Sequence, residues 1–115
     1  MLQYTLPLAS IRIKQGLLKR WYLDKYKIAN KAYPPSRVEK DDYILFKEDM
    51  TFISRSEGKM EEGSWSFNTN GSYIEMLDGT GEKVKAYVIT ITANLLILRF
   101  DVEEIRDMQA IYQAH

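Results

Sequence analysis

The sequence predicts an all-β fold, an eight-stranded antiparallel up-and-down barrel with a short helix near its N-terminus. Short segments that alternate apolar and polar residues recur along the chain, and polar turns separate them at short intervals. Closing such a meander on itself removes its exposed edges. The 115 residues suffice for one core, so we expect residues 1–115 to form one domain. An open sheet or sandwich is the alternative.

The chain opens with residues 1–16, a segment that we expect to lie under the barrel as a plug, with residues 4–16 helical. Its apolar patch has no basic residue ahead of it and is too short and interrupted for an export signal or a membrane span. The first strand, 17–28, places Trp21 and Leu23 on one face.

Seven further strands follow. We expect them at 42–47, 51–56, 61–70 up to its Asn-rich turn, 72–77, 84–92, 95–100 and 108–114. The last of these also fits a terminal helix. The tight turn "EDM" puts Met50 where a left-handed backbone favours glycine.

Alternate loops of a meander fall at opposite ends of a barrel. The turns near 47–50, 68–71 and 93–94 are short, whereas 29–40, 78–83 and 101–107 are longer. The sequence therefore predicts a tight floor, where Trp21 lies, and an open mouth over which loop 29–40 arches, stiffened by two prolines.

Alternation in "GSWSF" turns Trp65 and Phe67 to the same side of their strand. Extending this parity to the other strands puts a largely aromatic set inside: Trp21, Leu23, Phe46, Phe52, Trp65, Phe67, Tyr87, Ile89, Leu96, Leu98 and Phe100. Of these we expect Trp21, Phe46, Phe52, Trp65 and Phe67 to form the core and barrel floor. Eight strands enclose little room, so any cavity should be small.

Composition excludes several functions. Lys plus Arg and Asp plus Glu balance at 16 each, which argues against nucleic acid as a partner. The chain has no Cys for a disulfide or thiolate, and its single histidine, His115, ends the chain and cannot anchor a catalytic triad or metal site. The acidic clusters lack calcium-loop spacing. We predict no cofactor, no metal and no catalytic residue; a carboxylate pair at the mouth is the enzymatic alternative.

Four stretches resemble a known family. "LLKRW", "DYILFKEDMTF", "GSWSF" and "YVITITANLLIL" follow the order of motifs in small bacterial lipocalin-like domains, from Leu17 to Leu98. Lys19 and Met50 stand where that family usually has glycine. The resemblance implies a calycin barrel, a non-enzymatic role, and a small apolar or amphipathic ligand. It also implies the bacterial cell envelope or periplasm, with any lipidation Cys upstream of Met1; the cytoplasm stays the alternative.

Two hypotheses for the function follow. In the first, the mouth binds a small ligand; counting by two from the core gives the candidate ligand-binding residues Lys25, Asp42, Ser54, Met76, Lys85, Tyr87 and Phe100. The two lysines there suit an anionic head group, although they could instead pair with Asp42. In the second, the barrel is filled and acts as an interaction scaffold for a protein partner bound through loop 29–40.

Overall fold

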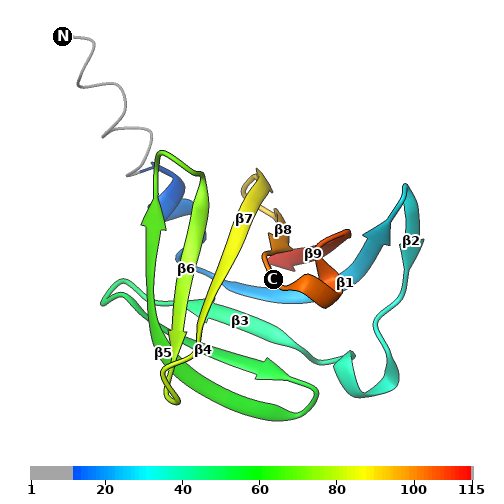
Figure 1. Cartoon of the computed structure of the whole chain (residues 1–115), viewed down its shortest axis with the longest axis horizontal. Helices are drawn as coiled ribbons and strands as arrows, with labels where there is room; N and C mark the ends of the chain where they lie inside the picture. Colours follow the sequence, from blue (N-terminus) through cyan, green and yellow to red (C-terminus); the bar gives the residue numbers. More distant parts are fainter. Residues whose placement is uncertain (1–11, 115) are drawn as a thin grey trace, which may run out of the picture.

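A computed structural model, which describes residues 12–114, has the predicted antiparallel barrel. Eight strands pair in the order β1-β3-β4-β5-β6-β7-β8-β9, and β1 also pairs with β9, which closes the sheet (Figure 1). Their bounds are β1 Arg20–Ile28, β3 Tyr43–Phe46, β4 Thr51–Ser56, β5 Lys59–Asn68, β6 Tyr73–Asp78, β7 Lys83–Ile91, β8 Leu95–Phe100 and β9 Met108–Ala114. The last segment is therefore a strand, and its pairing with β1 completes the barrel.

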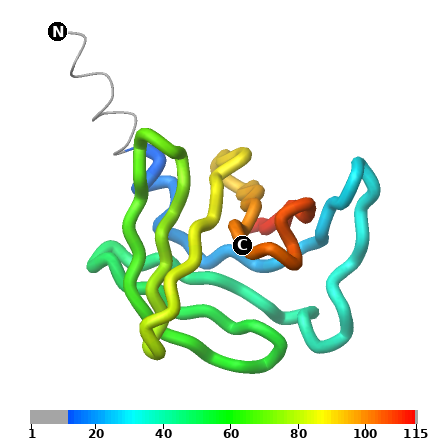
Figure 2. Tube along the Cα trace, in the orientation of Figure 1, coloured from blue at the N-terminus to red at the C-terminus, as the bar shows by residue number. Residues whose placement is uncertain are grey.

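A ninth strand, β2 (Lys31–Tyr33), was not predicted. It pairs with the far half of β1 through a turn at Ala29 and Asn30, whose φ angles are 50° and 68°. This hairpin extends away from the barrel, as the trace in Figure 2 shows. Loop 29–40 therefore does not simply arch over the mouth: only its later part, the 3₁₀ turn η2 (Arg37–Glu39), contributes to the mouth.

The N-terminal end of the barrel is closed by a helix over residues 12–17. Leu17 is fully buried, and its carbonyl accepts a 3.1 Å hydrogen bond from Nε1 of Trp21. Ile13 packs against the same core. The short N-terminal helix is present as predicted, and the rest of the expected plug segment, residues 1–11, lies outside the described part of the chain. Among residues 12–114, no helix is long and apolar enough to cross a membrane.

The core fills the floor half of the barrel. Phe46 and Trp65 pack edge to face with ring centroids 5.1 Å apart, and Nε1 of Trp65 donates to the Lys47 carbonyl at 3.1 Å, so this buried indole has a polar partner. Trp21 and Phe52 are buried with them, and Phe67 is half-buried against the cluster. The five residues predicted for the core and floor therefore all lie in or against the core.

Strand β7 has the opposite parity to the one predicted. Its inner positions hold the smaller Ala86 and Val88, whereas Tyr87 lies outside with its ring 5.6 Å from that of Tyr73. A register shift between Val88 and Thr90 leaves Ile89 46% exposed. The placement of Tyr87 and Ile89 inside was wrong because apolar residues occupy both faces of this strand, so alternation does not identify the inner one.

Two positions in the family motifs differ in what they need from glycine: Met50, which stands where the family usually has glycine, and Gly63, which begins "GSWSF". Met50 has a φ of 67°, the left-handed conformation predicted for the turn between β3 and β4. Gly63 allows β5 and β6 to approach closely, since a Cβ added there would lie 2.0 Å from the carbonyl oxygen of Leu77. The first position carries strain that glycine would relieve, and the second tolerates no side chain.

Candidate functional site

A cavity of about 490 Å³ opens at the end of the barrel opposite the helix. Its inner wall is apolar, with Leu23, Ile44, Phe52, Met76, Val84, Phe100 and Met108 among the residues that line it. The longer connections between strands surround its opening, including the 3₁₀ turn η3 (Glu103–Ile105) that follows β8. The size falls in the range of small-molecule sites, roughly 300–1,000 Å³.

The structure brings together four of the seven candidate ligand-binding residues. The four candidates that line this cavity are Asp42, in the loop before β3, Ser54 on β4, Met76 on β6 and Phe100 on β8. Their side chains lie where counting by two placed them, because the alternation in these strands is unbroken between core and mouth.

The other three candidates, Lys25, Lys85 and Tyr87, do not line the cavity, and their predicted inward placement was wrong. A register shift between Leu23 and Lys25 reverses the parity of β1, so Tyr26 takes the inner position and Lys25 is exposed. Lys85 belongs to the outer face of β7, where its Nζ lies 4.8 Å from the centre of the Tyr73 ring.

Asp42 is a buried carboxylate at the edge of the cavity. Its residue is 8% exposed, and its Oδ1 accepts a 2.9 Å hydrogen bond from the backbone N–H of Glu57 in the β4–β5 turn. The backbone N–H of Asp42 donates a hydrogen bond to the Glu39 carbonyl, and the Asp42 carbonyl accepts one from the Leu23 N–H. Burial raises the pKa of Asp42 above its ordinary value.

Two phenols lie beside this carboxylate. The hydroxyl of Tyr26 donates to Oε2 of Glu39, whose other oxygen accepts from the Ser36 N–H at 3.1 Å. Tyr112, on β9, is 6% exposed and its hydroxyl has no hydrogen-bond partner among residues 12–114. Since no fully buried polar side-chain atom in that range lacks a partner, the Tyr112 oxygen reaches the open space of the cavity. Burial raises the pKa of both phenols.

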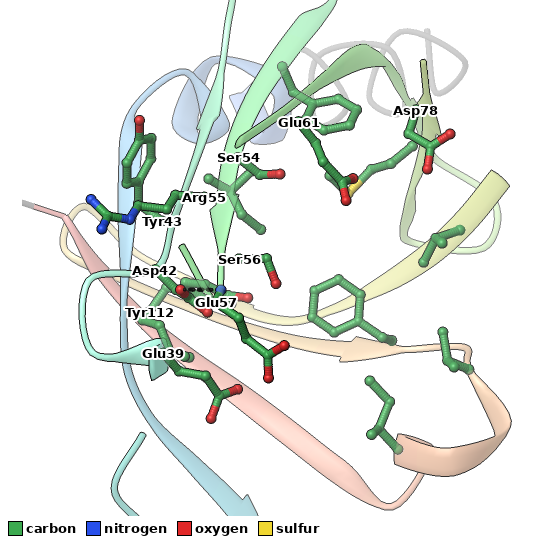
Figure 3. A pocket seen from close by; sticks show the side chains of 18 of the residues that line it. Glu39, Asp42, Tyr43, Ser54, Arg55, Ser56, Glu57, Glu61, Asp78 and Tyr112 are labelled. Atoms are coloured by element: carbon green, nitrogen blue, oxygen red, sulfur yellow. Dashed lines mark hydrogen bonds between the residues drawn. The ribbon is translucent and has the colours of Figure 1, made fainter. Parts of the chain in front are cut away.

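The mouth carries negative charge. Figure 3 shows Glu39, Asp42 and Glu57 grouped near Tyr112, with Glu61 and Asp78 on another side of the pocket. In all, six carboxylates line the cavity: Glu39, Asp42, Glu57, Glu61, Asp78 and Glu82. The single lining base, Arg55, alternates with the inward-facing Ser54 and Ser56, and Figure 3 shows its guanidinium beside Tyr43. It forms no salt bridge with these carboxylates, although its charge acts on Asp42.

No lining carboxylate has a salt bridge within the described chain, where the ion pairs are Lys83 with Glu75 and Arg106 with Asp101. Residues 12–114 also contain no group of three or more potential ligands placed to hold a metal ion. The acidic groups are therefore spread around the opening, where they give the cavity a negative potential without forming a chelating site.

Sequence reasoning missed Tyr26, Glu39, Glu61 and Tyr112. Glu61 could have been found, because it shares the parity of Trp65 and lies four residues nearer the mouth. Tyr26 could not, since it depends on the register shift in β1, and Glu39 depends on the path of the loop that carries η2.

Comparisons with known proteins agree with the observed fold. The family model described as "Lipocalin-like domain" matches residues 17–98. A lipocalin-like protein from Bacteroides uniformis is similar in structure, with a TM-score of 0.64 and 15% identity, covering 87% of this chain and 99% of that one. A DUF4847 family protein from Bacteroides vulgatus has a TM-score of 0.63 and 15% identity, covering 90% and 97%. No curated protein gives a significant match.

Proposed function

Because the chain belongs to the family of lipocalin-like domains, we propose that it is a non-enzymatic binding protein that takes a small apolar or amphipathic ligand into the mouth of its barrel. The observation that carries this proposal is the cavity of about 490 Å³ with an apolar inner wall. A ligand there would remove its own apolar surface and that of the wall from water, at about 25 cal/mol per Å² before the costs of association.

The arrangement of polar groups supports binding and gives little support to catalysis. Carboxylates line the opening, whereas apolar side chains such as Phe52, Met76 and Phe100 form much of the remaining wall. An amphipathic molecule can place its polar end at such a rim and its apolar end inside.

Binding is tested with a neutral, apolar fluorescent dye, N-phenyl-1-naphthylamine. We expect its emission to rise on addition of the protein, because the dye leaves water for the cavity. Val84→Phe adds a ring to an inner position of β7 and should reduce the signal. Lys85→Ala alters the neighbouring outer position and should leave the signal unchanged. A dye signal that is absent in the wild type, or equal in all three folded proteins, would overturn the proposal.

A second candidate function is a scaffold for a protein partner of the bacterial envelope. Three large apolar side chains are exposed close together in sequence: Ile28 at 38%, Tyr33 at 44% and Val38 at 60%. They belong to the β1–β2 hairpin and to η2, the region predicted to bind a partner. If this function holds, the wild-type protein should cross-link to one envelope protein in cells. The double variant Tyr33→Ser/Val38→Ser should lose that cross-link and still bind the dye.

The proposed location is the bacterial cell envelope or periplasm, as the family resemblance implies. Fractionation of cells that express the native gene tests it. Recovery with envelope or periplasmic markers supports the proposal, and recovery with cytoplasmic markers contradicts it.

A further inference from the structure

The charge of the cavity is the feature that the proposed function leaves unused. Six carboxylates line the cavity, and none has a salt-bridge partner in the described chain. The one lining base, Arg55, forms no ion pair with them, although its charge acts on Asp42. Lys25 and Lys85, the two bases expected there, lie outside the cavity. A bound anion would therefore meet an excess of negative charge, six carboxylates against one base, and a bound cation would relieve it.

Two buried polar groups face the cavity without a complete set of partners. Asp42 uses Oδ1 to accept from the Glu57 N–H, and its other oxygen has no hydrogen bond to any described residue. The Tyr112 hydroxyl has none either. Both side chains belong to residues at least nine-tenths buried, at 8% and 6% exposed. Neither of these atoms is sealed from the cavity, so both are free to accept a hydrogen bond from a ligand that enters it.

A bare metal ion does not suit this arrangement. No three potential metal ligands converge within residues 12–114, and the wall beside Asp42 is apolar, with Leu23 and Ile44 among its members. A cation with an attached apolar group matches both halves of the cavity, because its charge meets the carboxylates and its chain meets the wall.

We infer that the ligand of this cavity is an amphipathic cation, a small apolar chain or ring system that carries a protonated amine. The inference rests on the proposed function and names the ligand class for the same site. The ammonium group lies between Asp42 and Tyr112 and donates hydrogen bonds to both. The apolar part packs against the apolar wall that includes Phe52, Met76 and Phe100.

The test uses three ligands of equal chain length, octylammonium, octanol and octanoate, which displace N-phenyl-1-naphthylamine from the protein at neutral pH. We expect octylammonium to bind about tenfold more tightly than octanol, since hydrogen bonds to charged groups contribute more than neutral ones. Octanoate should bind more weakly than octanol. Raising the salt concentration should reduce the preference for the cation.

Three variants assign the preference to this site. Asp42→Asn keeps the shape and the acceptor for Glu57 but removes the charge, and it should lower octylammonium affinity about tenfold with little effect on octanol. Tyr112→Phe should lower octylammonium affinity by a smaller factor. Glu75→Gln is the matched control: it removes one negative charge, from a residue paired with Lys83 outside the cavity, and should change neither affinity.

The outcomes separate this inference from the proposed function. If octanol and the dye bind but octylammonium shows no advantage, or if octanoate binds best, the cationic ligand is wrong and the binding function stands. If Glu75→Gln weakens octylammonium as much as Asp42→Asn does, the preference arises from net charge and the site is wrong. If none of the four molecules binds the folded wild type, both proposals fail.

Discussion

The backbone N–H of Glu57 donates a 2.9 Å hydrogen bond to Oδ1 of Asp42, joining the β4–β5 turn to the segment that precedes β3. The bond crosses one side of the cavity opening, and both residues line it. Buried carboxylates are commonly paired with a cation in a salt bridge. Here a backbone amide donates the hydrogen bond to Asp42 instead. The charge of Asp42 is held at the mouth without being neutralised, so it is available to a ligand.

Removing this charge should stabilise the protein at neutral pH. Burial raises the pKa of Asp42, so the folded state binds the proton more tightly than the unfolded state, and the ionised form opposes folding. Asp42→Asn should raise the melting temperature at pH 7 by a few degrees. As the pH falls through the raised pKa toward the ordinary value of about 3.9, the wild type is protonated as well and the difference should disappear.

Other groups near Asp42 also titrate or carry charge: Tyr26, Glu39, Arg55, Glu57 and Tyr112. These groups are present in both the wild type and Asp42→Asn, so the difference in melting temperature between the two proteins reports mainly the charge of Asp42. A variant that is less stable than the wild type at pH 7 would show that the gain from a charged acceptor in the bond from Glu57 outweighs desolvation of the charge.

The β4–β5 turn contains avoidable backbone strain. Glu57 and Gly58 have φ angles of 52° and 82°, a pair of left-handed residues for which Asn-Gly is the favoured sequence. Glu57→Asn should therefore raise the free energy of unfolding by roughly 0.5–1 kcal/mol in urea denaturation. Glu57→Gln is the control, since it removes the charge but not the strain. Equal stabilisation by both variants would attribute the gain to charge.

Met50 is left-handed too, with a φ of 67°, but its side chain also packs against the core. Met50→Gly removes strain of about 1 kcal/mol together with that packing. We expect a smaller rise in melting temperature than for Glu57→Asn. A clear loss of stability would show that packing dominates at this turn.

Gly63 should not accept a side chain. An added Cβ would lie 2.0 Å from the Leu77 carbonyl oxygen and 2.8 Å from the Phe52 ring, so β5 and β6 would have to separate. Gly63→Ala should lower the free energy of unfolding by roughly 2–4 kcal/mol. Gly79→Ala is the matched control, because its Cβ would meet only the Glu62 carbonyl at 3.7 Å. Similar losses in both variants would exclude the steric explanation.

The double variant Lys25→Ala/Lys85→Ala should leave ligand binding unchanged. Neither lysine lines the cavity: Lys25 is exposed after the register shift in β1, and the Lys85 ammonium lies over the outward-facing Tyr73 ring. Dye binding and displacement by octylammonium measure this directly. A tenfold loss in the double variant would restore the lysines to the site.

The sequence predicted the barrel well because alternation and turn residues are local signals. The core positions Trp21, Phe52 and Trp65 and the cavity residues Asp42 and Met76 all lie where unbroken alternation puts them. Long stretches of regular strand make such counting reliable from the floor toward the mouth.

The charge of the site could not be predicted in the same way. A single extra residue in β1 exchanged Lys25 for Tyr26 at the mouth, and no residue type marks that position as a bulge. The turn at Ala29 and Asn30 also lacks glycine, so the sequence did not indicate a hairpin there. For that reason neither β2 nor the path that brings Glu39 to the cavity was predicted. Together with the opposite parity of β7, which places Lys85 outside, these changes removed both expected lysines from the site and left its carboxylates.

Methionine methyl groups report whether a ligand enters the mouth of the barrel. Met76 and Met108 line the cavity, whereas Met60 is 57% exposed on β5 and does not line it. In protein labelled with ¹³C at methionine methyl groups, titration with octylammonium should shift the Met76 and Met108 signals and leave that of Met60 unchanged. If Met76 and Met108 do not move at saturating ligand, or if only Met60 moves, the ligand does not occupy the barrel.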